Sequence, residues 1–437
     1  MTKIATIEYT HRRQALLTQL PQGAVVIVQC AAVHIRNGDV EHDYRQDSSF
    51  FYLSGMLESQ ATLVLANGVN GPSSTIFCAS KNKLQEIWHG RRLGVDAAPG
   101  VLMVDHAYSN ESLADKLIDL LDGASQVVYS FSRSDTGEQV QQSLTSLRRL
   151  GRQGKICPTQ LVDLDPLVDA MRLFKSAAEV DQMALACDIS VTAHERAMQV
   201  CKVGMNEYQL AAELHHQFAM QGSPRVAYGS IVAGGENACI LHYTNNDQVL
   251  QDGDLVLIDA GCELDHYASD ITRTFPVNGR FSDPQKTIYE LVLAAHQATL
   301  QCIKPGAVFT DMQDVAVKVI TQGLIDIGLL TGELDKNIED KTFRKFYMHN
   351  IGHWLGMDVH DVGAYKLDGA SRPLLAGMVT TVEPGIYIDP DDMQIDPQWR
   401  GIGVRIEDNI LVTDTGYRNL TADLPVSVAD IETLMAS

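Results

Sequence analysis

Carboxylates that follow apolar runs are the first residues of this sequence that could carry out chemistry. Leu255-Val256-Leu257-Ile258 has the composition of a buried strand and runs directly into Asp259, and Asp270 follows eleven residues later. An ionised carboxylate at the end of a buried strand is costly unless a positive partner meets it. Each acid alone has a simpler interpretation, as a turn residue or as the partner of Arg273. The two residues by themselves leave both interpretations open.

Three histidines stand close together further along the chain. His349, His353 and His360 fall within twelve residues, and glycines separate them, which favours a loop over a regular helix. Neutral imidazole is a good ligand for first-row metal ions. A lone histidine is more often structural, but the cluster favours a site.

Two further carboxylates end or interrupt apolar strands. Glu383 follows Thr380-Thr381-Val382 and precedes Pro-Gly, and Glu407 lies in an apolar strand two residues after Arg405, with which it could form a surface pair. Together with Asp259, Asp270 and a histidine, these acids suit two hard or borderline divalent ions, such as manganese, better than one zinc. Two ions about 3.5–4 Å apart can share a hydroxide and clamp both the attacking and the polarised oxygen.

The elements that must position these residues form two domains. Residues 1–174 alternate strand-like runs (24–28, 61–65, 126–129) with helical spacing (113–121), which predicts a mixed α/β domain. Ser176 and Glu179 form a capping-box pattern that opens a helix, and we place the second domain at residues 175–437. Its predicted helices are 177–200, 206–221, 284–303 and 310–328, and the pattern of helices followed by strands occurs twice.

Composition excludes several classes of protein. The 437 residues carry a formal net charge of −21, which disfavours nucleic acid as a partner. Eight scattered cysteines without a Cys-x-x-Cys pair indicate reduced thiols. The sequence contains neither a signal-peptide pattern nor an apolar run long enough to span a membrane. These features predict a cytoplasmic protein.

The five candidate ligands resemble, in order and context, those of the pita-bread metallopeptidases, which include methionine aminopeptidase, prolidase and aminopeptidase P. The surrounding motifs look like bacterial-type aminopeptidase P over nearly the whole chain, although Asn350-Ile351-Gly352 before His353 departs slightly from the usual small residues. In the second domain they are CILHYT (239–244), residues 252–278, HWLG (353–356) and GIGVRIED (401–408). In the first they are YRQDS (44–48), EIWHGRRLG (86–94) and MRLFKS (171–176).

The resemblance implies an α/β (α+β) chain in which a smaller, creatinase-like N-terminal domain precedes a pita-bread catalytic domain. It implies a metalloaminopeptidase that cleaves the N-terminal Xaa-Pro bond of peptides through a metal-bridging hydroxide. Asp259 would bind one ion, His353 and Glu383 the other, and Asp270 and Glu407 would bridge two divalent ions, manganese above all.

The same resemblance implies further roles. Glu383 would shuttle a proton to the leaving nitrogen, and His242 and His360 would contact the scissile peptide. Other substrate-lining residues would be His349, Tyr365 and Arg405. Members of this family often form homo-oligomers, here a dimer or tetramer, in which a neighbour's N-terminal domain supplies the pocket rim, with Trp88, Asp39 and Arg152 as candidates.

Three alternatives remain at this point. Prolidase shares the metal ligands but cuts only dipeptides that end in proline. The same hydroxide could also attack phosphotriesters incidentally. A metal-free binding protein of the same fold is the alternative of another class, and the presence of all five ligand types argues against it, because clustered buried carboxylates have no physical advantage without a cation.

Overall fold

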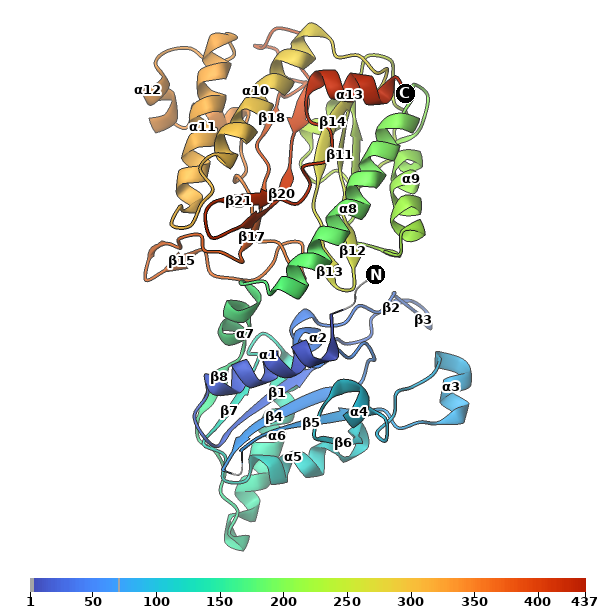
Figure 1. Ribbon diagram of the computed structural model, residues 1–437, viewed down its shortest axis with the longest axis vertical. Helices are drawn as coiled ribbons and strands as arrows, with labels where there is room; N and C mark the ends of the chain where they lie inside the picture. Colours follow the sequence, from blue (N-terminus) through green and yellow to red (C-terminus); the bar gives the residue numbers. More distant parts are fainter. Residues whose placement is uncertain (1–3, 70) are drawn as a thin grey trace. The chain divides into compact units, whose positions relative to one another are not determined.

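The computed structural model describes residues 4–69 and 71–437, which form two compact units, one of residues up to 171 and one from Arg172 to Ser437 (Figure 1). Each is described by itself. Within the described residues, no helix is both long and apolar enough to cross a membrane.

The first unit contains a mixed six-stranded sheet in the order β6-β5-β4-β1-β7-β8. Strand β4 is antiparallel to both of its neighbours, and the other pairs are parallel. The elements are α1 (Thr6–Thr18), β1 (Ala24–Gln29), β2 (Ile35–Asn37), β3 (Val40–Glu41), α2 (Ser48–Ser54), β4 (Thr62–Gly68), β5 (Gly71–Cys78), α3 (Lys83–His89), α4 (Ala98–Leu102), β6 (His106–Ser109), η1 (Asn110–Ser112), α5 (Leu113–Leu121), β7 (Gln126–Tyr129), α6 (Ser134–Arg149), η2 (Leu150–Gln153), β8 (Leu161–Asp163) and α7 (Asp165–Arg172).

Alternating apolar side chains explain how this sheet is covered. Val25 and Ile27 point to one face of β1, where they pack with Leu117 of α5 and with Leu144 and Leu147 of α6. The intervening residue Val26 points to the opposite face and is also fully buried. The strands are therefore buried on both faces, which confirms the predicted mixed α/β domain.

The second unit surrounds short sheets with two helix pairs. In Figure 1, α8 and α9 lie on one side of the strands, and α10 and α11 lie on the other. Its elements are α8 (Ala177–Val200), α9 (Glu207–Met220), β9 (Arg225–Val226), β10 (Ile231–Gly234), η3 (Gly235–Cys239), β11 (Leu255–Asp259), β12 (Cys262–Leu264), β13 (Tyr267–Ala268), β14 (Thr272–Pro276), α10 (Asp283–Leu300), α11 (Phe309–Asp326), α12 (Leu334–Glu339), η4 (Thr342–Lys345), β15 (Lys366–Leu367), β16 (Ala370–Ser371), β17 (Val379–Val382), β18 (Gly385–Tyr387), β19 (Gly403–Arg405), β20 (Asp408–Val412), β21 (Tyr417–Asn419) and α13 (Val428–Met435).

The four helices predicted for this unit are present, with ends within a few residues of the predicted ones. Helix α8 begins as expected: the Ser176 hydroxyl accepts from the Glu179 amide, and the Glu179 carboxylate accepts from the Ser176 amide. A helix pair followed by strands occurs twice, as α8–α9 before β10–β14 and α10–α11 before β17–β20. The unit is the pita-bread arrangement that the motifs predicted.

Cross-strand register places the acidic residues. In the antiparallel pair of β11 and β14, Asp259 lies opposite Thr272. Thr272 also forms a bridge with Glu407, and Val382, beside Glu383, lies opposite Asp408 on β20. Strand ends from four parts of the sequence therefore meet at one place.

Candidate active site

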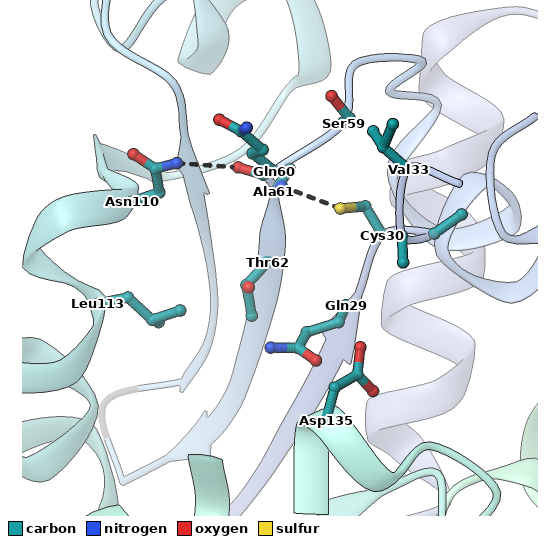
Figure 2. Close-up of a pocket in the computed structure, with 12 residues that line it drawn as sticks. Gln29, Cys30, Val33, Ser59, Gln60, Ala61, Thr62, Asn110, Leu113 and Asp135 are labelled. Atoms are coloured by element: carbon teal, nitrogen blue, oxygen red, sulfur yellow. Dashed lines mark hydrogen bonds between the residues drawn. The ribbon is translucent and has the colours of Figure 1, made fainter. Parts of the chain in front are cut away.

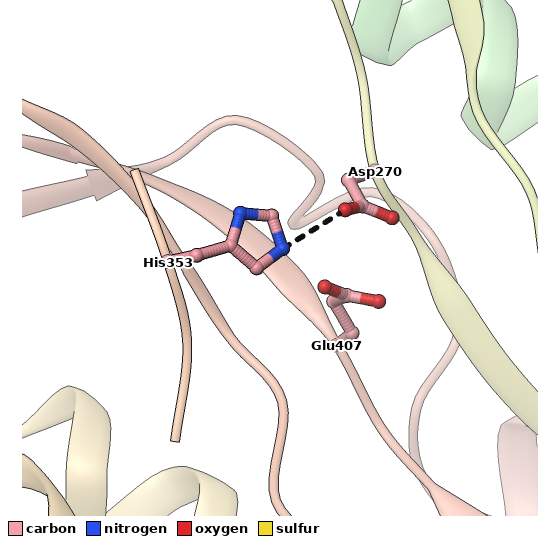
Figure 3. A group of neighbouring side chains, drawn as sticks. All are labelled: Asp270, His353 and Glu407. Carbon is pink, nitrogen blue, oxygen red and sulfur yellow. Dashed lines mark ion pairs between the residues drawn. The ribbon is translucent and has the colours of Figure 1, made fainter. Parts of the chain in front are cut away.

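The centre of this place is a triad of Asp270, His353 and Glu407. One ligand atom from each lies within 4.8 Å of the other two (Figure 3). His353 Nε2 is 3.3 Å from the Asp270 carboxylate and 3.5 Å from that of Glu383. Asp270 lies in the loop just before β14, which begins two residues later at Thr272.

The remaining predicted ligand, Asp259, joins the triad through a tyrosine. The Tyr228 hydroxyl lies 2.6 Å from Asp259 Oδ1 and 2.5 Å from Asp270 Oδ1. All five predicted ligands line one cavity of about 640 Å³. Tyr228 gives no signal in the sequence, because an isolated tyrosine in the segment before β10 belongs to no pattern.

Close packing of the main chain holds His353 in this cavity. Its amide donates to Thr381 Oγ1 at 3.1 Å, and its Nδ1 lies 3.0 Å from the Trp354 carbonyl. A side chain at Gly352 would collide with the Thr381 carbonyl, so the backbone must approach β17 without a Cβ atom there. The predicted glycine-rich loop is thereby explained.

Burial gives the acids of this site unusual protonation behaviour. It raises the pKa of Glu383 to about 7, and it raises the pKa of Glu407 well above the ordinary value, where the charges of Asp270, Glu383 and Asp259 add to the effect. Burial alone would lower the pKa of His353, but the hydrogen bond to Asp270 raises it to about 9. The cationic side chains at this site supply less positive charge than is needed to compensate four ionised carboxylates.

Arg405 connects the acids to a second group of residues. Its Nη2 lies 2.6 Å from Asp259 Oδ2 and its Nη1 lies 2.9 Å from the Tyr387 hydroxyl, which is 2.8 Å from His349 Nε2. Burial lowers the pKa of His349 to about 4, so this imidazole is neutral. The alternative of a surface pair between Arg405 and Glu407 is wrong, because Arg405 is buried and pairs with Asp259.

Arg405 reaches Glu407 indirectly. Its Nε donates to Thr272 Oγ1 at 3.1 Å, and the same hydroxyl donates to Glu407 Oε2 at 2.7 Å. The alternative partner suggested for Arg273 is also wrong: Arg273 pairs at 2.7 Å with Asp408 and donates to the Glu407 carbonyl.

The remaining predicted residues of this domain line the same cavity. His242, His360 and Tyr365 do so together with the ligands. The His360 ring lies 4.4 Å from that of His353, centroid to centroid, and burial lowers its pKa. The Tyr365 hydroxyl accepts from the Trp354 amide at 2.9 Å.

The three rim candidates lie elsewhere, in the N-terminal unit. Trp88 on α3 is 80% exposed, and Asp39, in the turn between β2 and β3, and Arg152 on η2 are exposed. The residues that line the cavity all belong to the second unit. These candidates therefore stay predictions about a neighbouring subunit.

A buried side-chain amide that was not predicted from the sequence supports Asp270. The fully buried Asn409 accepts from the Asp270 amide through Oδ1 at 3.0 Å and donates to the Asp270 carbonyl through Nδ2. These two hydrogen bonds resemble those that the main chain of a neighbouring strand would form with Asp270. Its sequence signal was slight, a polar residue inside the apolar run that ends at Val412.

The donor set fits divalent cations. Four carboxylates and one imidazole converge, some buried and some partly exposed, with too few cationic side chains beside them. A bound cation would relieve that imbalance. Oxygen-rich sets of this kind suit hard or borderline ions. Fold and site together define a metal-dependent hydrolase of the pita-bread class.

Comparison with known proteins identifies the family. The family model "Metallopeptidase family M24" matches residues 181–414, and "Aminopeptidase P, N-terminal domain" matches residues 9–129. Xaa-Pro aminopeptidase of Escherichia coli is 43% identical over 439 residues, covering 100% of this chain and 99% of the relative. That of Haemophilus influenzae is 43% identical over 435 residues, covering 100% and 98%. The chain belongs to metallopeptidase family M24 and, within it, to the Xaa-Pro aminopeptidases.

Solved structures agree along the whole chain. Aminopeptidase PepP of Pseudomonas aeruginosa has a TM-score of 0.99 and 48% identity, with 100% of this chain and 99% of that chain covered. A zinc-substituted form of E. coli aminopeptidase P in complex with product has a TM-score of 0.97 and 43% identity, with the same coverage. Matches of this extent confirm the predicted fold and enzyme class and disfavour the metal-free alternative.

Proposed function

We propose that this Xaa-Pro aminopeptidase holds two divalent metal ions, and that Mn²⁺ serves it best. The observation that carries the proposal is the convergence of Asp259, Asp270, His353, Glu383 and Glu407 on one cavity. Asp259 would bind one ion, His353 and Glu383 the other, and Asp270 and Glu407 both. When bound, such ions acidify water and polarise a carbonyl oxygen.

The side chains of this chain supply binding and proton transfer. The Glu383 carboxylate carries a proton towards the leaving proline nitrogen. His242 and His360 donate hydrogen bonds to the scissile carbonyl and stabilise the tetrahedral intermediate. His349, Arg405 and Tyr365 line the substrate cavity, with Arg405 also keeping Asp259 in place at 2.6 Å.

Proline at the second position of the substrate explains why the site acts on the preceding carbonyl group. It has no amide proton and a fixed φ, so a peptidase that depends on that donor binds it poorly. A site that acts on the preceding carbonyl through histidines and ions does not need the missing proton. The substrates are therefore peptides that begin Xaa-Pro.

The N-terminal domain, residues 1–174 in this proposal, would limit the site to one residue before the cut. Trp88, Asp39 and Arg152 of a neighbouring copy are the proposed rim in a dimer or tetramer, while the catalytic domain spans residues 175–437. We propose a cytoplasmic protein without nucleic-acid partners, since the net charge of −21 repels phosphate.

Peptide length and metal content test the proposal. Hydrolysis of Xaa-Pro-Yaa and longer peptides, with Xaa-Ala-Yaa as the matched control, should exceed hydrolysis of the dipeptide Xaa-Pro. Activity confined to the dipeptide would indicate prolidase. Elemental analysis should give two ions per chain and the highest activity with Mn²⁺. One tightly held zinc, with no response to manganese, would contradict the two-ion assignment.

A further inference from the structure

Two buried cations just before α8 are paired with the loop that carries His360. Arg172 Nη2 lies 2.6 Å from carboxylate oxygens of both Asp358 and Asp361, and Lys175 Nζ lies 2.9 Å from Asp361. The side chains of Lys175 and Asp361 are each 1% exposed, and that of Arg172 is 3% exposed. The paired acids flank His360 on either side in the sequence.

The loop that carries His360 is closed by a backbone hydrogen bond and packs closely against Lys175. The Asp361 amide donates to the Trp354 carbonyl at 2.9 Å, so residues 354–361 form a closed turn. A Cβ atom at Gly356 would collide with the Asp361 carboxylate and lie 2.9 Å from Lys175 Cε. The turn is therefore packed directly against the lysine stem, and the buried charges make its position costly to change.

His360 itself has no comparable support. Its side chain lies on the exposed side of the turn, its ring contacts that of His353, and the described residues donate no hydrogen bond to it and accept none from it. The position of its imidazole consequently depends on the main chain of the turn. The ion pairs of Asp358 and Asp361 connect that main chain to Arg172 and Lys175.

We infer that Arg172 and Lys175 are positioning residues for the reaction: through Asp358 and Asp361 they hold the turn that presents His360 to the substrate. This inference rests on the proposed contact of His360 with the scissile peptide. It gives a role to the segment MRLFKS (171–176), whose two cations lie outside the cavity lining.

A double-mutant cycle tests the inference. Lys175→Met keeps the apolar stem and removes the charge, and in the wild-type background it should lower kcat roughly 10- to 100-fold, as expected for a misplaced catalytic group. In the His360→Ala background the same change should lower kcat less than about threefold, because the group it positions is gone. Metal content should equal that of the wild type, and Lys175→Arg should restore most of the lost kcat.

A matched control separates positioning from general stability. Leu324→Ala leaves a cavity in place of a fully buried side chain on α11 that has no contact with the ion pairs of the turn. It should lower the melting temperature without changing kcat. If Lys175→Met fails to fold, Asp358→Asn removes the more exposed partner, whose side chain is 36% exposed. It should lower kcat about three- to tenfold, again only when His360 is present.

The outcomes are distinguishable. Full kcat in Lys175→Met, an equal loss with and without His360, or loss of metal from Lys175→Met would each overturn the positioning role. Full kcat in His360→Ala alone would instead overturn the proposed function of His360.

Discussion

The two units each contain a cavity at strand ends, and the cavities differ in charge. The N-terminal cavity, of about 350 Å³, lies where β1 ends and β4 begins, and its lining is mostly neutral (Figure 2). Its one carboxylate, Asp135, is paired with Arg133 at 3.0 Å. The catalytic cavity is lined by five carboxylates. Strand ends produce a hollow in both units, but only the excess of acid in one of them makes it a candidate metal site.

Two neighbouring residues show the same contrast at closer range. Asp408 is matched by Arg273 at 2.7 Å and by His296 at 3.2 Å, and although burial opposes it, these partners hold its pKa well below the ordinary value. For Glu407, burial and then the charges of neighbouring carboxylates raise the pKa well above the ordinary value. Asp408 is a structural anion with its partners in place, whereas Glu407 is the acid that we propose to bind a cation.

The largest expected effect separates these two acids. Glu407→Gln should weaken binding of both ions by at least about 100-fold and abolish most activity, since it is assigned to bridge them. Asp408→Asn is the matched control: it should retain metal but lower the free energy of unfolding by about 3–5 kcal/mol, because it leaves Arg273 buried and unpaired. Elemental analysis and denaturant unfolding measure both. If neither variant lost metal, the contrast drawn between Glu407 and Asp408 would be wrong.

Two further variants test the assignment of the ligands. Asp270→Ala should behave as Glu407→Gln, and Asp259→Ala should mainly lose one ion.

The next largest effect concerns two histidines of the catalytic cavity that are not assigned as metal ligands. His242→Ala and His360→Ala should keep near-normal metal content and lower kcat roughly 10²–10³-fold, the usual result of losing one transition-state hydrogen bond. Steady-state kinetics on metal-saturated protein would show this. An emptied metal site in His360→Ala would mean that this residue is a ligand.

A smaller effect is expected from the hydroxyl that links two ligands. Tyr228→Phe removes the donor shared by Asp259 and Asp270 while keeping the ring. Metal affinity should fall about 10- to 100-fold, as is typical when a partner of a metal ligand is removed. Competition with a chelator measures the affinity, and Tyr243→Phe, whose hydroxyl bonds Glu207 outside the cavity, is the matched control.

The smallest effect belongs to the N-terminal cavity. Thr62→Val, at a residue 4% exposed in its lining, should change the free energy of unfolding by at most about 1 kcal/mol and leave kcat and metal content unchanged. Activity and thermal unfolding measured side by side would check this. A loss of kcat beyond that explained by unfolding would mean that the N-terminal cavity also serves the reaction.

The sequence by itself determined which residues could act. Strand composition and a carboxylate at the strand end identified Asp259, the histidine cluster identified His353, and the capping box identified the start of α8 at Ala177. These signals are local, because helix and strand periodicity and caps involve residues a few positions apart. The order and context of the five ligands then led to the family.

Only the tertiary structure decided which residues meet. Tyr228 reaches Asp270 across 42 positions, Asn409 reaches it across 139, and Lys175 reaches Asp361 across 186. The partners assigned to Arg273 and Arg405 from sequence neighbours were wrong for the same reason. Local periodicity states which face a side chain occupies, whereas strand register and the packing of distant segments decide what faces it.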